Sequence, residues 1–98
     1  MDKYIEQIKK IVLSFLENEN MMIIFFGSRA EGNADEGSDV DIAIKGEKSI
    51  EPLLISKIKT RLEESNIPYR VDIIDLRKAD KVFVQNVLET GIVWKNFN

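Results

Sequence analysis

The apolar run Met21–Phe26, followed at once by Gly27 and Ser28, is the feature that most constrains how this chain can fold. It is the longest fully apolar run in the chain, and it is far shorter than the ~20 residues that span a bilayer. Glycine and serine are typical turn residues, so the run is predicted to be a buried strand that ends at a turn. The opening residues have no signal-peptide layout, and we expect a cytoplasmic protein outside the membrane.

Apolar residues recur at helical spacing in three other segments, which are therefore predicted to be helices. These segments are residues 2–19, 50–66 and 79–90, with Pro52 in the first turn of the second. Ser49 is predicted to cap the second helix, and Gly91 is predicted to end the third in the left-handed conformation. Further strands are predicted at residues 39–45, 69–76 and 92–94.

Strands and helices alternate along the chain, which indicates an α/β domain built around one small sheet. Polar and apolar side chains alternate over residues 39–45, a pattern typical of a strand with one packed face and one polar face. The length of 98 residues allows one domain, and residues 1–98 are predicted to form it.

The composition excludes several kinds of site. The chain has no His and no Cys, so it holds neither a Ser-His-Asp nor a Cys-His nucleophile, no ordinary zinc or haem site and no disulfide. Any metal must bind oxygen ligands, which points to Mg²⁺, Mn²⁺ or Ca²⁺. The formal charge of -3 argues against tight, nonspecific binding to nucleic acid.

Gly27 and Ser28 are the first candidates for chemistry, because glycine lets the backbone approach a ligand closely. Free N–H groups at the start of a helix favour phosphate, and the Ser28 hydroxyl could add a hydrogen bond. The alternative is a plain turn at the end of a strand, which glycine and serine form in many proteins.

Acidic residues form the second candidate group. Asp39 and Asp41 lie two apart on a predicted strand, which puts both carboxylates on one face, roughly 6.5–7 Å apart along the chain. Asp72 would stand beside them if its strand is a neighbour, and a divalent ion would relieve the repulsion. The alternative is a solvated strand face, with Asp72 hydrated or paired with Arg70. Asp75 is a rival third acid, but it lies on the opposite face and could cap the helix that follows.

The joint pattern of a phosphate turn, two acids at strand spacing and a third on another strand is that of a two-metal phosphoryl-transfer site. Gly27-Ser28, ten intervening residues and then Asp39-Val40-Asp41 resembles the signature of the DNA polymerase β-like nucleotidyltransferases. The likeness is greatest to the minimal nucleotidyltransferases, and Val71–Asp75 is similar to their strand with the third acid. The resemblance implies an α/β (α+β) fold like the polymerase β palm, with a small mixed sheet and helices mainly on one face.

The resemblance also implies the roles of single residues. Gly27 and Ser28 would hold the triphosphate of ATP or of another NTP. Asp39 and Asp41 would ligate two Mg²⁺ ions, with Mn²⁺ as an alternative. Asp72 would ligate one of these ions and help to deprotonate the attacking hydroxyl. The hydroxyl would attack the α-phosphorus, so that a nucleoside monophosphate is transferred and pyrophosphate is released.

Two features of the turn and loop stay open. Arg29 matches the motif as a nucleotide-binding residue, but it could either touch phosphate or pair with a nearby acid. Many members carry a basic residue where Glu31 stands. Here Glu31, Asp35 and Glu36 make the loop acidic, which would repel a triphosphate in the absence of metal.

The resemblance implies a partner as well, because minimal nucleotidyltransferases are often paired with a small helical protein of the HEPN class. The chain would then act as an antitoxin that nucleotidylates its HEPN partner. The alternatives are a non-catalytic module that neutralises the partner by contact alone and a structural α/β domain with accidental acids. Trp94 and Phe97 could anchor a partner, although Trp94 could equally complete the core. The sequence is also compatible with a homo-oligomer.

Overall fold

The computed structural model describes residues 2–35 and 37–97 and confirms the predicted order of helices and strands. The elements are α1 (Lys3–Leu16), β1 (Met21–Phe26), α2 (Ser28–Glu31), β2 (Val40–Gly46), α3 (Pro52–Glu63), β3 (Val71–Asp75), the 3₁₀ turn η1 (Leu76–Lys78), α4 (Lys81–Thr90) and β4 (Ile92–Lys95). None of the helices in these ranges has the length and apolar content needed to cross a membrane.

The four strands form one mixed sheet in the order β3-β2-β1-β4. Strand β1 is antiparallel to both β2 and β4, whereas β2 and β3 are parallel. Because β2 and β3 run in the same direction, the residues that begin these two strands meet at the same end of the sheet. This end also receives the last residue of β1, where Phe26 is opposite Asp41.

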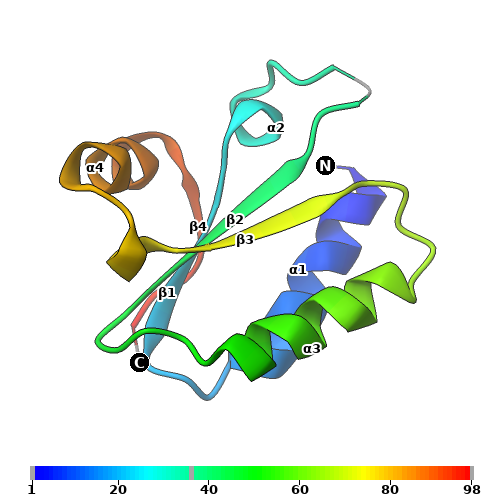
Figure 1. Ribbon diagram of the computed structural model, residues 1–98. Helices are drawn as coiled ribbons and strands as arrows, with labels where there is room; N and C mark the ends of the chain where they lie inside the picture. Colours follow the sequence, from blue (N-terminus) through cyan, green and yellow to red (C-terminus); the bar gives the residue numbers. More distant parts are fainter. Residues whose placement is uncertain (1, 36, 98) are drawn as a thin grey trace.

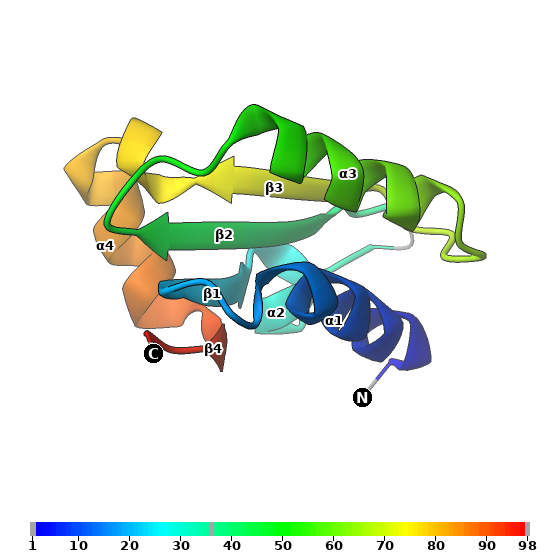
Figure 2. The same ribbon diagram turned by 90° about the horizontal axis from the view of Figure 1, so that it is seen from below.

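Helices α1 and α3 cover one face of the sheet (Figures 1 and 2). The apolar stripe of α1 contributes Ile8 and Val12, and α3 contributes Ile58; all three side chains are fully buried. They belong to one cluster with Val40 and Ile42 of β2, which are also fully buried. Removal of these surfaces from water is the main source of stability for a domain of this size.

Helix α4 lies on the other face of the sheet (Figure 1). Val87 of α4 and Leu76 of η1 form a second apolar cluster with Ile24 and Ala43. The prediction of a polar face is therefore wrong for this half of the sheet. Position 43 falls on the same side as Asp41, and its small alanine lies in the buried cluster beneath α4.

Two predicted helix ends differ from the structure. Gly91 follows α4 with φ -81° and ψ 165°, which is extended and not left-handed. A Cβ at this position would collide with Ile24 and stand 2.7 Å from the carbonyl oxygen of Val87, so glycine is needed here for close packing. Ser49 does not cap α3, because Glu51 is the capping position and its side chain makes no capping bond.

Asp75 has a structural role that fits its predicted place on the packed side. Its carboxylate is 8% exposed and accepts hydrogen bonds from the backbone N–H of Ile50 at 3.1 Å and of Arg77 at 3.0 Å. It thus caps the 3₁₀ turn η1, whereas the predicted helix α4 is capped by Asp80, and it also fixes the connection between β2 and α3. Asp75 is therefore separate from the acids on the polar side.

Trp94 completes the core at the β4 edge. Its ring stacks on Phe25 with centroids 5.2 Å apart, and it packs against the larger apolar cluster. The core interpretation of Trp94 is therefore confirmed, whereas Phe97 remains 41% exposed beyond the sheet.

Candidate active site

The structure brings the three predicted acids to one end of the sheet. Asp41 of β2 is directly opposite Asp72 of β3 in the parallel register, and Asp39 lies one residue before β2 begins. Neighbouring strands are about 4.8 Å apart, so the two facing carboxylates are within reach of each other. The start of β2 is fixed by a 2.8 Å hydrogen bond from the Val40 N–H to the carbonyl oxygen of Arg70. The expected adjacency of the two strands is thus correct.

Gly27 lies against the middle acid of this group. Its φ of 85° and ψ of -167° belong to a region that is essentially restricted to glycine. A Cβ on this residue would overlap a carboxylate oxygen of Asp41. The backbone of Gly27 can therefore pack against Asp41 only because residue 27 has no side chain.

The acids influence one another electrostatically. Burial raises the pKa of the Asp41 carboxyl, and the negative charges of Asp72 and then Asp39 raise this pKa further. Among the described residues, Asp72 forms no ion pair with Arg70 that would remove the repulsion. Three carboxylates whose charges repel form a group that a cation would stabilise.

The donor set fits a hard divalent cation in kind, because Asp39, Asp41 and Asp72 offer only carboxylate oxygens. Within residues 2–35 and 37–97, no group of three acidic side chains is close enough to hold an ion without rearrangement. The three side chains would therefore have to turn toward a bound ion.

The segment between Gly27 and Asp39 is ordered by local hydrogen bonds. The Asn33 N–H donates to the carbonyl oxygen of Ser28 at 2.9 Å, which closes the short helix α2. Asp35 and Ser38 form a turn, in which the Ser38 N–H donates to the Asp35 carbonyl at 3.1 Å. The side chains of Glu31 and Asp35 are exposed, and Glu36 lies outside the described residues.

Arg29 makes contacts that the sequence did not indicate. Its Nε–H donates a 2.8 Å hydrogen bond to the carbonyl oxygen of Ser38, the residue just before Asp39. Its guanidinium carbon lies 3.9 Å from the centre of the Tyr69 ring, which is a cation–π contact. Arg29 and Tyr69 are forty positions apart, and no local pattern in the sequence connects them.

Tyr69 is in turn fixed by the beginning of α1. Its hydroxyl donates a hydrogen bond to the carboxylate of Asp2, and its ring meets Tyr4 edge-on with centroids 5.6 Å apart. Asp2 also caps α1, because it accepts a 2.7 Å hydrogen bond from the Tyr4 N–H. The chain's N-terminal helix therefore supports the contact between Arg29 and Tyr69.

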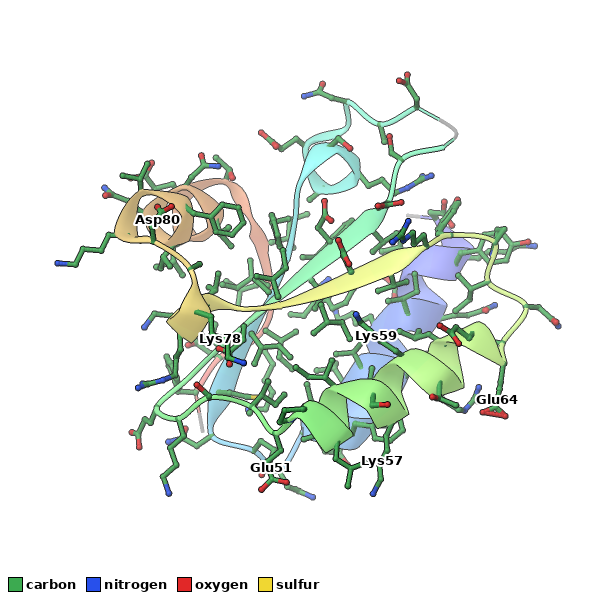
Figure 3. All side chains as sticks on the ribbon, viewed as in Figure 1. Glu51, Lys57, Lys59, Glu64, Lys78 and Asp80 are labelled. Atoms are coloured by element: carbon green, nitrogen blue, oxygen red, sulfur yellow. The ribbon has the colours of Figure 1, made fainter. Side chains whose placement is uncertain are left out.

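A groove of about 340 Å³ opens beside Asp72, between α3 and the start of β3. Lys59 and Glu63 line one wall, and Tyr69 and Arg70 line the other. Lys59 reaches from α3 toward β3, whereas Lys57 on the same helix points away from the sheet (Figure 3).

A larger cavity of about 520 Å³ lies near Met21 and Gly46. Gly46 ends β2, and Met21, which begins the antiparallel β1, is its partner in the sheet. This cavity is therefore at the end of the sheet opposite the acids, and it contributes no side chain to the candidate site.

Comparison with known proteins identifies the family to which this chain belongs. The model of the family described as polymerase beta, nucleotidyltransferase matches residues 6–96, which include the turn and all three acids. The chain belongs to this family. The nucleotidyltransferase fold implied by the motif resemblance is therefore confirmed.

Individual nucleotidyltransferases are similar over most of the chain. MntA of Haemophilus influenzae, named a probable protein adenylyltransferase, is 34% identical over 68 residues, which are 69% of this chain and 60% of that protein. The chain thus spans less than two-thirds of this relative's length. A structure described as that of a minimal nucleotidyltransferase is 30% identical, with a TM-score of 0.73, and covers 94% of this chain and 95% of that one. A chain in a crystal structure of a toxin–antitoxin with AMP-PNP is 25% identical, with a TM-score of 0.71, covering 92% of this chain and 74% of that one.

Proposed function

We propose that this nucleotidyltransferase transfers AMP from ATP to a hydroxyl group of a protein partner and acts as an antitoxin. The observation that carries the proposal is the pairing of Asp41 with Asp72 next to the bare backbone of Gly27. Asp39 adds a third carboxylate to this group. The protein adenylyltransferase name of one relative and the AMP-PNP in a similar toxin–antitoxin structure support ATP as the donor.

Asp39, Asp41 and Asp72 would hold divalent cations, with Mg²⁺ favoured, Mn²⁺ as an alternative and two ions expected from the family resemblance. Such ions neutralise phosphate charge and lower the pKa of an attacking oxygen when they are bound. Gly27 and Ser28 would receive the triphosphate, because glycine lets the backbone approach a ligand closely and free N–H groups at the start of a helix favour phosphate.

Asp72 is the residue placed to take the proton, because it lies on the edge strand β3 and borders the groove beside α3. The acceptor oxygen would attack the α-phosphorus as its proton passes to Asp72. The bond from this phosphorus to the oxygen that bridges to the β-phosphate would break, and pyrophosphate would leave.

For the partner we propose a small helical protein of the HEPN class, which would offer its hydroxyl through the groove beside Asp72. Lys59 and Arg70 are cations on the two walls of this groove. They would guide an acceptor segment that carries acidic residues next to its hydroxyl. The toxin–antitoxin assembly of the similar chain supports a partner of this kind.

The test uses ATP labelled at the α-phosphate and, in parallel, ATP labelled at the γ-phosphate. Each is incubated with the purified protein, Mg²⁺ and a lysate of the source cell, and the control is the Asp39→Asn/Asp41→Asn double variant. We expect a protein band with α-label and no γ-label, which disappears with the variant and identifies the acceptor. Absence of label when the partner is shown to be bound would instead establish a module that acts by contact alone.

A further inference from the structure

We propose that Arg29 and Tyr69 are positioning residues that hold the Gly27–Ser28 turn in a fixed place relative to Asp39 and Asp72. This inference rests on the proposed function, because it assigns these residues a role in shaping the same site. Arg29 comes directly after the turn, and its side chain contacts two other segments of the chain. Each of these segments leads within a few residues to one of the acids.

The hydrogen bond from Arg29 to Ser38 fixes the backbone position of Asp39. Asp39 lies outside β2 and therefore lacks the support of the regular hydrogen bonds between strands. Its backbone is held from both sides: Arg29 binds the carbonyl oxygen of Ser38, and the Val40 N–H binds the carbonyl oxygen of Arg70. Loss of the Arg29 bond would leave Ser38 held only by its local turn with Asp35, which is not attached to the sheet, and Asp39 tied to the sheet only through Val40. The carboxylate of Asp39 would then be free to move away from Asp41.

The second contact controls the start of β3. Tyr69 lies two residues before this strand and three before Asp72. The Asp2 carboxylate and the Tyr4 ring contact Tyr69, and the guanidinium of Arg29 lies over its ring. A rotation of β3 relative to α2 would therefore break the stack.

The competing role for Arg29 is direct binding of a nucleotide phosphate. The observed contacts favour positioning, because the Nε–H is used by the backbone and one face of the guanidinium is used by the ring. Tyr69 separates the two roles experimentally. It lies outside the Gly27–Ser28 turn and its hydroxyl donates to Asp2, so we expect its loss to affect the acids only if the stack positions them.

The test observes the acids without nucleotide, in ¹⁵N-labelled protein titrated with substoichiometric Mn²⁺. A bound paramagnetic ion broadens the amide signals near it, and weak binding is sufficient for this effect. In the wild type we expect the signals of Asp39, Asp41 and Asp72 to broaden together. In Tyr69→Leu and Arg29→Lys, the same broadening of Asp39 should need about tenfold more Mn²⁺, as is typical when support of a metal ligand is lost.

Tyr69→Phe keeps the ring and should remain within about twofold of the wild type, since the stack is the contact that matters. Lys57→Ala is the distant control on α3. In the transfer assay, Tyr69→Leu should lower kcat about tenfold or more while the KM for ATP is nearly unchanged, because misplacement affects the reaction rather than nucleotide binding. If Tyr69→Leu does not fold, Arg29→Lys carries the same comparison.

Unchanged Mn²⁺ broadening in Tyr69→Leu and Arg29→Lys would overturn the inference, and so would a wild type whose three acids do not broaden together. A raised KM for ATP in Arg29→Lys alone would assign Arg29 to phosphate binding. The Mn²⁺ results are independent of catalysis. Should the wild type transfer no nucleotide and still show the expected Mn²⁺ pattern, the proposed function fails and the positioning role stands.

Discussion

A carboxylate oxygen of Asp41 occupies the space that a Cβ on residue 27 would fill, so Gly27 and Asp41 are in direct steric contact. The antiparallel pairing of Phe26 with Asp41 creates this contact, because it carries the turn after β1 over the first part of β2. Two independent requirements therefore act on position 27, a positive φ of 85° and the proximity of the acid.

Gly27→Ala should abolish nucleotidyl transfer and lower the free energy of unfolding by about 1–3 kcal/mol from backbone strain, with a further loss from the collision with Asp41. Gly32→Ala is the matched control, because Gly32 also has a positive φ, of 78°, but has no atom within 4 Å of its Cβ position. It should cost about 1–2 kcal/mol and keep activity. Urea unfolding and α-label transfer measure the two effects, and equal behaviour of both variants would contradict the steric argument.

Asp39→Asn/Asp41→Asn should lose transfer while the protein remains folded. Burial and the charges of Asp72 and Asp39 raise the pKa of Asp41, which means that the folded protein disfavours the charged form. Neutral asparagines remove this repulsion, so the melting temperature should stay equal or rise. Circular dichroism melting checks the stability. Full activity of the variant would refute the mechanism, and unfolding would make the pair structural.

Lys59→Glu should weaken use of the protein acceptor, because it reverses the charge on the α3 wall of the groove beside Asp72. We expect the KM for the acceptor to rise about tenfold and the KM for ATP to stay constant. Lys57→Glu makes the same charge change on the same helix, but its side chain points away from the sheet (Figure 3). Steady-state kinetics with the labelled acceptor compare the two, and similar kinetics for both would remove the groove from the acceptor path.

The bond between Tyr69 and Asp2 predicts a pH dependence of stability. The Tyr69 hydroxyl is the main cause that lowers the pKa of Asp2 below its ordinary 3.8, and backbone N–H groups add to it. A lowered carboxyl pKa stabilises the folded state above the unfolded pKa, and this stability is lost as the pH falls through the folded value. Urea unfolding of the wild type and Tyr69→Phe should therefore converge below about pH 4. A constant difference down to pH 2 would show that the hydroxyl does not act through Asp2.

Gly91→Ala should destabilise the protein without any backbone strain, since φ at this residue is -81°. The added methyl group would collide with Ile24 beneath α4, and such overpacking costs about 1–3 kcal/mol. Gly37→Ala, in open space, should be nearly neutral. Thermal unfolding of both variants is the measurement. An equal melting temperature for the two variants would mean that α4 can shift to accommodate the methyl group without loss of stability.

Local periodicity was sufficient to predict β2 and the common face of Asp39 and Asp41, because side chains alternate strictly along a strand. It could not establish that Asp72 is next to Asp41, since strand order depends on contacts between distant segments. The motif resemblance supplied that relationship. The same limit explains the error at the polar face, where Ala43 is buried by a helix that follows it by about forty residues.

The contact of Arg29 with Tyr69 was missed for a related reason. Both residues are ordinary on their own: Arg29 lies in the short helix α2 after the turn, and Tyr69 lies two residues before β3. Only the folded chain shows that they stack, and that Asp2 supports the stack from the first helix. A tyrosine just before the strand of the third acid could have drawn attention, but nothing in its neighbourhood identified Arg29 as its partner.

Helix α4 has two structural roles. It covers the second apolar cluster, which includes Ala43, and it lies on the face of the sheet that carries Asp41. Substitutions that would widen the site in this direction must therefore also disturb the core. The exposed charged side chains of the groove beside β3, Glu63 and Arg70, have no such double role, whereas Leu62 in the same groove belongs to the larger apolar cluster. Variation in substrate can accumulate at these charged positions at little cost in stability, and we expect evolution or design of new acceptors to proceed there.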